Sequence, residues 1–303
     1  MTHLPLRGRT DGDGWVRCPC GRRHWGRYGA AGLLLRHGRE VLLQHRALWS
    51  HEGGTWGLPG GARSSGEDAL SGALREAGEE AGVPASVVRP TCAWTEDHGA
   101  WSYTTVLATS DRRVSPVPGD AESLALAWVA VDEVTRHPLH PALAEAWPDL
   151  LDLSGRRLVL LVDAANVVGA RPDGWWRDRA GATLRLRRGL ERFSRRGVAA
   201  PALGGISPVT RRRPSHWWPE VVLVVEGAAR GVPSATTVEV VAAAGPGDDT
   251  LVGLADGRRR ERPDDLVVAV TADRDLRRRL DRLGVPARGA GWLLGLLDPA
   301  EGS

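Results

Sequence analysis

The chain of 303 residues is long for one compact domain and long enough for two. Its apolar and charged fractions, 42% and 25%, are those of an ordinary soluble globular protein, and its formal net charge is only +3. All 40 basic residues are arginine, because the sequence contains no lysine. Three cysteines cannot build a disulfide framework, the N-terminus lacks the apolar core of a signal peptide, and no apolar run is long enough to span a bilayer. We therefore expect a cytoplasmic protein with no membrane partner.

Short apolar runs in the first half of the chain predict strands, with one long helical stretch among them. The expected strands are residues 29–35, 41–45, 55–58, 87–94, 103–108 and 124–131. The first two flank a polar turn and predict a strand pair. Short helices are expected at residues 131–135 and 141–145. Mixed strands around one long helix indicate an α+β fold.

The long helix is expected at residues 67–81, which contain no proline. A capping box at its start is offered by Ser64 with Glu67, or by Ser65 with Asp68. Gly82, with Pro84 two residues later, is expected to end it.

The second half has a different sequence pattern, in which continuous aliphatic strands alternate with helices. Strands are expected at residues 158–162, 221–225, 238–241 and 266–270, and helices at about 177–196, near Asp248 and at 273–283. This pattern predicts a parallel sheet covered on both faces, an α/β fold. We expect residues 198–219, rich in proline and arginine, to be an irregular surface excursion. The boundary is placed at residues 153–157, giving an extension at 1–24 and domains at 25–155 and 156–303.

The long helix carries three carboxylates on one face. At about 100° per residue, Glu76, Glu79 and Glu80 fall within an arc of about 100°. Like charges so spaced repel, and Arg75 is the only base in the helix body to pair with them. A hard divalent cation removes that cost, and oxygen ligands suit magnesium or manganese. The opposite face of this helix, with Leu70, Leu74 and Ala77, is expected to pack on the sheet. Gly60 and Gly61, which lack a Cβ, are expected to let the backbone pass close to the metal.

This segment resembles the Nudix box, a pattern of nine positions at fixed spacing. The matching residues are Gly61, Glu67, Arg75, Glu76, Ala77, Glu79, Glu80, Gly82 and Val83. The preceding Gly-Thr-Trp-Gly-Leu-Pro-Gly is similar to the usual approach to that box, and Ala77 is smaller than the usual aliphatic residue. The resemblance covers about residues 25–150. It implies magnesium-dependent cleavage of a nucleoside diphosphate linked to another group.

The resemblance also implies roles for the residues. Glu79 and Glu80 would bind the metal with the carbonyl of Gly60, and Glu76 would bind a second metal or orient the attacking water. Arg75 would hold a glutamate by bidentate pairing and Glu67 would support it. Many members of the family use a further acid outside the box; Glu122 is the candidate here, with an ordinary surface glutamate as the alternative.

Substrate choice lies outside the box. An oxidised nucleoside triphosphate, a dinucleoside polyphosphate and a nucleotide sugar all remain open. Tryptophans could stack on a base or belong to the core. The candidates are Trp49, Trp56, Trp94 and Trp101.

Near the N-terminus, Cys18, Cys20 and His24 suggest a zinc site. The spacing of the two cysteines is tighter than usual and the sequence shows no fourth ligand. A loop without metal is the alternative.

A second set of acids follows the strands of the C-terminal half. Asp163 and Asn166 follow the first strand, and Glu226, Asp248, Asp249, Asp273 and Asp275 follow or precede later ones. Acids converging at the carboxyl ends of strands can hold one or two magnesium ions for phosphodiester hydrolysis. The alternative is that they cap helices, which we expect to hold for Asp273 and less for Asp163, since no helix is expected after it.

Two segments, Val-Asp-Ala-Ala-Asn-Val and Val-Thr-Ala-Asp-Arg-Asp-Leu, resemble the first and last acidic motifs of NYN/PIN-like nuclease domains over residues 157–297. The resemblance implies that Asp163 and Asp273 bind metal with help from Asn166, Asp249 and Asp275, and leaves the role of Glu226 open. The second half carries the excess of arginine, which favours an anionic partner such as RNA. A ribonuclease with a Nudix nucleotide sensor, and a non-catalytic ligand-sensing regulator, are the alternative interpretations.

Overall fold

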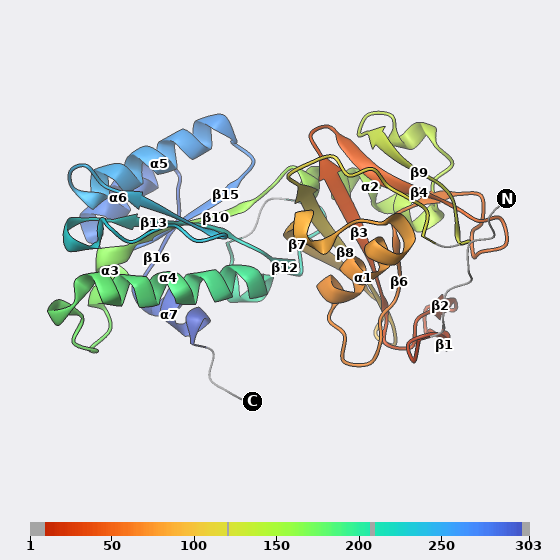
Figure 1. Cartoon of the computed structure of the whole chain (residues 1–303), viewed down its shortest axis with the longest axis horizontal. Helices are drawn as coiled ribbons and strands as arrows, with labels where there is room; N and C mark the ends of the chain where they lie inside the picture. Colours follow the sequence, from red (N-terminus) through yellow and green to blue (C-terminus); the bar gives the residue numbers. More distant parts are fainter. Residues whose placement is uncertain (1–9, 120, 207–209, 299–303) are drawn as a thin grey trace. The chain divides into compact units, whose positions relative to one another are not determined.

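The computed structural model describes residues 10–119, 121–206 and 210–298. The chain divides into two compact units, Met1–Ser154 with Val209–Ser215, and Gly155–Pro208 with His216–Ser303 (Figure 1). Residues 1–9 of the expected N-terminal extension lie outside the described residues. Every helix in the described part of the chain is too short or too polar to cross a membrane.

The first unit is built on a mixed sheet, as expected. Its strand order is β7-β8-β3-β4-β5, with β6 on β3 and β9 on β4. β3 is antiparallel to β4 and β6 and parallel to β8, so both senses occur in one sheet. The strands are β3 (Ala30–His37), β4 (Glu40–Arg46), β5 (Trp56–Gly57), β6 (Gly60–Ala62), β7 (Val88–Asp97), β8 (Ser102–Ser110) and β9 (Ser123–Ala130).

The predicted strand pair is β3 and β4, joined through Gly38, whose φ of 58° is the left-handed value that glycine adopts without strain. The apolar residues of both strands are fully buried, which supplies the core of this unit. A separate two-stranded hairpin, β1 (Trp15–Arg17) with β2 (Arg23–Trp25), precedes them.

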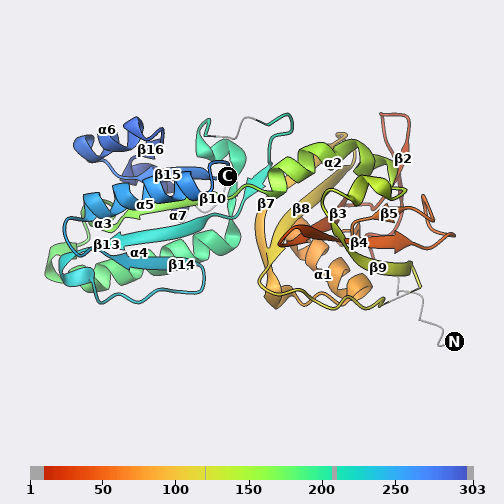
Figure 2. The same cartoon turned by 90° about the horizontal axis from the view of Figure 1, so that it is seen from above.

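The long helix is α1 (Ala69–Ala81), and it lies against β3 and β6 (Figure 2). Neither expected capping box caps the helix. Asp68 is the N-cap and accepts a bond from the Ser71 amide at 2.8 Å, while the Ser64 amide donates to Glu67 one turn earlier. The helix therefore starts two residues later than expected. Gly82 ends it with φ 65°, as predicted.

The last helix of this unit, α2 (Pro141–Ser154), runs nine residues beyond the expected 141–145, straight through Pro148. A proline removes one helical hydrogen bond. Burial of Leu143, Trp147, Leu150 and Leu153 on one face offsets that loss. The helix expected at 131–135 is a single 3-10 turn, Val134–Arg136, and another lies at Ala85–Val87.

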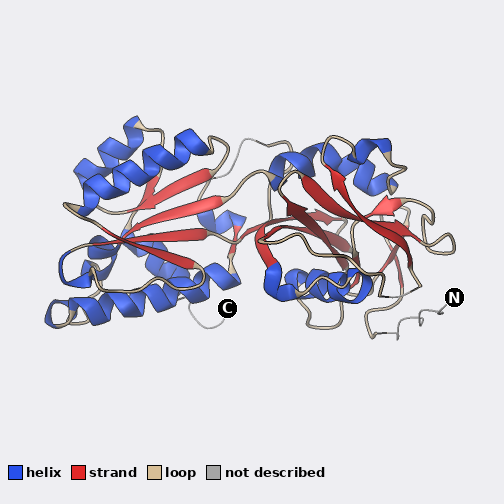
Figure 3. Ribbon diagram, turned by 45° about the horizontal axis from the view of Figure 1, so that its top comes forward, coloured by secondary structure: helices blue, strands red, loops and turns tan. Residues whose placement is uncertain are grey.

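The second unit is a five-stranded parallel sheet in the order β14-β13-β10-β15-β16. The α/β expectation is thus confirmed for this half. Helices α5 and α6 cover one face and α3, α4 and α7 the other (Figure 3). The strands are β10 (Leu158–Asp163), β13 (Glu220–Val225), β14 (Val238–Ala242), β15 (Leu266–Val270) and β16 (Ala287–Arg288). The helices are α3 (Ala164–Gly169), α4 (Arg179–Arg196), α5 (Gly247–Glu261), α6 (Arg274–Arg282) and α7 (Ala290–Leu297), with 3-10 turns at Trp175–Arg177, Ala200–Leu203 and Gly227–Ala229.

The stretch 198–219 is more ordered than expected. It holds a short strand pair, β11 (Val198–Ala199) with β12 (His216–Trp217). Residues 210–215 belong to the first unit, although they follow residues 155–208 of the second unit in the sequence. There the Ser215 amide donates to the Ala93 carbonyl at 2.8 Å. Part of the C-terminal half of the sequence therefore helps to build the N-terminal unit.

Candidate functional site

The predicted site residues lie where β6 leads into α1. Gly60 and Gly61 pair with β3 opposite Gly32 and Ala31. A side chain at Gly61 would meet the carboxylate of Glu76, whose atoms lie 2.8–2.9 Å from the position of a Cβ. Glycine at this position therefore makes room for that carboxylate.

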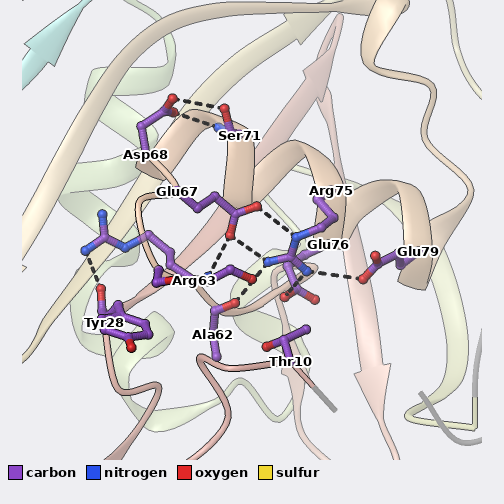
Figure 4. A network of polar contacts seen from close by, with 12 residues as sticks. Thr10, Tyr28, Ala62, Arg63, Glu67, Asp68, Ser71, Arg75, Glu76 and Glu79 are labelled. Carbon is purple, nitrogen blue, oxygen red and sulfur yellow. Dashed lines mark hydrogen bonds and ion pairs between the residues drawn. The ribbon is translucent and has the colours of Figure 1, made fainter. Parts of the chain in front are cut away.

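Arg75 joins the carboxylates of the box into one network (Figure 4). Its guanidinium donates two bonds to Glu67, each 2.8 Å, one to Glu76 at 2.8 Å and one to Glu79 at 3.2 Å. A further bond reaches the Ala62 carbonyl at 3.0 Å. The hydrogen bonds to Glu67 are the main reason that the pKa of Arg75 lies above its usual range, so the side chain stays charged. One arginine thus balances part of the charge of three glutamates.

The helical arc suggested that Glu76, Glu79 and Glu80 share one exposed face, but in the structure they do not. Glu76 and Glu80 are buried, at 0% and 2% exposure, while the Glu79 side chain is 43% exposed. The face against the sheet carries Glu76 and Glu80 together with Ala77, and Leu70 and Leu74 are half-buried. The helix can bring the Glu76 carboxylate against the sheet because β6 presents Gly61 there.

Glu80 and the backbone of Gly60 are in direct contact. The Gly60 amide donates to Glu80 Oε2 at 2.8 Å. This bond holds the buried Glu80 carboxylate beside Gly60. The carbonyl of Gly60 is the backbone ligand that the Nudix resemblance implies. The oxygen-rich donor set formed by Glu76, Glu79 and Glu80 suits a hard ion such as Mg²⁺ or Mn²⁺.

Tyr103 on β8 is a further residue of the site that no sequence motif marks. Its hydroxyl approaches Gly32, where a Cβ would lie 2.1 Å from it. Burial raises the pKa of the Tyr103 phenol to about 12; Arg46 lowers it, and the charges of Glu80 and Glu76 raise it further. The phenol therefore stays neutral, close to the two buried glutamates. No spacing in the sequence marks a tyrosine 23 residues beyond Glu80, since the β3–β8 pairing brings it there.

Glu122 lies in the turn before β9, where its backbone carbonyl accepts from the Ala47 amide at 2.8 Å.

The four candidate tryptophans occupy different surroundings. Trp94 is buried, Trp49 is 62% exposed, and Trp101 stacks on His24. Trp56 stacks on His45, with ring centroids 4.8 Å apart and planes within 5°.

Residues 26–150 match the NUDIX domain family. A Mycobacterium tuberculosis protein named as a candidate 8-oxo-dGTP diphosphatase is 53% identical over 153 residues, which cover 47% of this chain and 70% of that protein. This chain belongs to the Nudix hydrolase family. Its N-terminal unit is therefore a pyrophosphohydrolase, and hydrolases of this family generally use divalent metals such as Mg²⁺.

Two further relatives carry the same Nudix region. A nucleoside triphosphate pyrophosphatase/Nudix hydrolase fusion protein from Bifidobacterium longum is 47% identical, over 45% of this chain and 30% of that protein. A crystal structure of the Nudix hydrolase RenU from M. smegmatis is 45% identical, over 47% of this chain and 95% of that one, with a TM-score of 0.45.

Outside the Nudix region, four acids gather at the carboxyl edge of the parallel sheet. Asp163 ends β10, and its two oxygens accept from the Asn166 amide and the Thr271 hydroxyl, both at 3.0 Å. Burial raises its pKa, and the charges of Glu226 and Asp273 act in the same direction. Burial likewise raises the pKa of Asp248, with contributions from Asp163, Asp273 and Glu226.

The structure corrects several expectations about this second set. Asp163 does cap a helix, α3, which the sequence analysis did not expect. Asp249 pairs with Arg279 at 2.7 Å and Asp275 pairs with Arg278. Asp248, which was not among the expected ligands, lies near enough to Asp163, Asp273 and Glu226 for their charges to raise its pKa. Asp273 caps α6, as expected, and Asn166 accepts from the Ala272 amide at 2.8 Å.

Proposed function

We propose that the Nudix unit hydrolyses an oxidised purine nucleoside triphosphate to its monophosphate and pyrophosphate. Water attacks a phosphorus atom, the bond to the bridging oxygen breaks, and pyrophosphate leaves. Bound Mg²⁺ or Mn²⁺ would lower the pKa of the attacking water and offset charge on the leaving group. The observation that carries the proposal is the contact of the buried Glu80 with Gly60, beside Glu76 and Glu79.

Each residue has a proposed role. Glu79 and Glu80 bind the metal together with the Gly60 carbonyl, and Glu76 binds a second ion or orients the water. Arg75 positions Glu76 and Glu79 with the help of Glu67. Glu122 is proposed as a further ligand from the turn before β9.

The substrate class rests on the relative that is 53% identical and named as a candidate 8-oxo-dGTP diphosphatase. Beside the catalytic helix, Arg46 lies close enough to Tyr103 and to His140 to lower the pKa of both. His140 is held by a bond of 2.8 Å from its amide to the Trp56 carbonyl. We propose that the nucleotide binds on this side, with Arg46 contacting it and Trp56 beside the base.

Magnesium-dependent turnover of 8-oxo-dGTP, dGTP, a dinucleoside polyphosphate and a nucleotide sugar tests the substrate class. We expect the highest kcat/KM for 8-oxo-dGTP. Arg46→Ala should raise KM about tenfold, and Arg39→Ala, an exposed arginine in the preceding turn, should not. Preferred turnover of a nucleotide sugar or a dinucleoside polyphosphate would overturn this substrate class while leaving the Nudix chemistry in place.

A second function is proposed for the C-terminal unit, as an NYN/PIN-like, metal-dependent ribonuclease spanning residues 156–303. In chain order, the sheet begins with β10 and adds β13 and then β14 on one side of it. The chain then adds β15 and β16 on the other side of β10. Open α/β sheets bind ligands where the strand order reverses in this way, at the carboxyl ends of the strands. Asp163 and Asp273 follow those two strands. In this proposal residues 25–155 are the Nudix domain, and the Nudix site could serve as a nucleotide sensor.

Cleavage of single-stranded and structured RNA by the full chain with Mg²⁺ or Mn²⁺ tests this second function. We expect Asp163→Asn to abolish cleavage and Asp281→Asn, at an exposed position on α6, to leave it unchanged. Salt-dependent RNA binding without cleavage would instead support a regulator that only binds. Neither outcome depends on turnover by the Nudix unit.

A further inference from the structure

Four metal-ligating side chains meet at the N-terminal hairpin, away from the Nudix box. Cys18, Cys20 and His24 come from the hairpin, and His98 comes from the turn that follows β7. One ligand atom of each lies within 4.8 Å of those of the other three, and Cys20 Sγ is 3.2 Å from His24 Nε2. The fold therefore supplies the fourth ligand that the sequence did not reveal.

The hairpin backbone is shaped to present its two cysteines. The Cys18 amide donates to the Arg22 carbonyl at 3.1 Å, and the Gly21 amide donates back to Cys18 at 3.0 Å. Gly21 has φ 83°, a left-handed value that lets the chain turn tightly behind Cys20. Both cysteine side chains consequently lie on the same side as His24.

The two histidines are held by neighbours. His24 stacks on the Trp101 ring, with centroids 4.1 Å apart and planes within 9°. The His98 amide donates to the Trp101 carbonyl at 2.9 Å, and its ring is 3.3 Å from a carboxylate oxygen of Glu96. Carboxylates beside metal-binding histidines are a common arrangement in zinc sites, because they fix the orientation of the ring.

We propose that Cys18, Cys20, His24 and His98 bind one structural zinc ion. In a tetrahedral site, Zn–S bonds of about 2.3 Å and Zn–N bonds of about 2.0 Å place the ligand atoms roughly 3.3–3.8 Å apart. The cluster needs a contraction of about 1.5 Å at most to reach that geometry. Four protein ligands close the coordination sphere, which is the mark of a structural rather than a catalytic zinc ion.

This site differs chemically from the one in the Nudix box. Thiolates and imidazoles select zinc, whereas the carboxylates of Glu76, Glu79 and Glu80 suit magnesium or manganese. The two ions should therefore be removable and replaceable independently of each other.

The zinc ion would stabilise a part of the chain that has little core of its own. Each strand of the hairpin has three residues, and two-stranded hairpins of this size are barely stable alone. Around the hairpin, the Arg27 amide donates to Gly12 at 2.7 Å, and the Ser65 amide donates to Asp11 at 3.2 Å. Ser65 belongs to the loop that enters α1. Holding the hairpin in place thus supports the entry to the catalytic helix.

Metal analysis of the untagged full-length protein, purified without added metal, tests the proposal. We expect one zinc per chain, retained in excess Mg²⁺ and released when the thiols are titrated with a mercurial reagent. Replacement by Co²⁺ should give the intense visible absorption of a tetrahedral site with thiolate ligands. Less than about a tenth of an equivalent of zinc, both as purified and after refolding with zinc, would overturn the proposal.

Matched variants separate loss of the ligand from loss of the fold. Cys20→Ser and His98→Ala should each lower zinc affinity at least tenfold, whereas Cys92→Ala and His216→Ala should retain one equivalent. Cys92 is buried within β7, and neither control residue belongs to the cluster. Circular dichroism confirms that each variant is folded. Full zinc content in folded Cys20→Ser and His98→Ala would contradict the assignment.

Discussion

Arg75 and Glu67 face each other through two parallel hydrogen bonds, each 2.8 Å long, although Glu67 lies before the helix that carries Arg75. Such a fork is specific to arginine, because its planar guanidinium matches the two oxygens of a carboxylate. The same guanidinium also reaches Glu76 and Glu79. The orientation of Glu67, Glu76 and Glu79 therefore depends on one side chain.

Arg75→Lys should lower kcat/KM for nucleotide hydrolysis by at least about tenfold, about 1.4 kcal/mol. Lysine keeps the charge but cannot form the fork and reach Glu76 and Glu79 at the same time. Steady-state kinetics measures the effect, and Arg89→Lys, at an exposed ion pair with Asp111, is the control. Equal kinetics in the two variants would show that the fork is dispensable.

Gly61→Ala should reduce activity by about a hundredfold and lower stability by about 1–3 kcal/mol. The new methyl group would overlap the Glu76 carboxylate, which is buried and has little room to move. Gly78→Ala on α1 is the matched control, since its Cβ would meet nothing closer than 3.6 Å and alanine favours helix. Kinetics and urea unfolding of both variants check the prediction, which fails if Gly61→Ala turns over like Gly78→Ala.

Arg212→Ala should destabilise the Nudix unit by about 1–3 kcal/mol. The guanidinium lies 4.4 Å from the centre of the Trp94 ring and donates to Asp149 at 2.7 Å, and the side chains of both partners are largely buried. Thermal unfolding measures the loss. The exposed Arg211→Ala is the control, and a melting temperature as high as that of the control would contradict this role for residues 210–215.

Asp163→Asn should leave the melting temperature unchanged or raise it by a few degrees. Asparagine caps helices about as well as aspartate, so α3 keeps its cap. Because burial, Glu226 and Asp273 raise the pKa of Asp163, its charged form costs stability at neutral pH, and asparagine removes that cost. Asp265→Asn should do the opposite, since Asp265 is buried against Arg157 at 2.6 Å. An equal decrease of the melting temperature in Asp163→Asn and Asp265→Asn would contradict this difference between the two aspartates.

The spacing of the Nudix box predicted the helix, its end at Gly82 and the residues that meet around Gly61. These features follow from local rules, namely helical periodicity and the freedom of glycine. The burial of Glu76 and Glu80 did not follow, because it depends on how α1 packs against β3 and β6, where Gly61 leaves room for the Glu76 carboxylate and the Gly60 amide donates to Glu80.

Contacts between segments far apart in the chain also could not be predicted from the sequence. His98 joins Cys18 only through the turn after β7, 80 residues away. Asp248 in the first turn of α5 lies near Asp163, Glu226 and Asp273, which come from other segments of the chain. Sequence patterns place a residue on an element, but tertiary packing decides which neighbour it meets.

The most direct test of the account is magnesium-dependent hydrolysis by Glu80→Gln in the full-length chain. Glutamine keeps the shape of the buried side chain and removes the charge that the metal requires. We expect at least a thousandfold loss of kcat for nucleotide hydrolysis, with the fold intact by circular dichroism, and the same for Glu79→Gln. The exposed Glu133→Gln should behave like the wild type. Wild-type turnover by folded Glu80→Gln would contradict the assignment of the catalytic site.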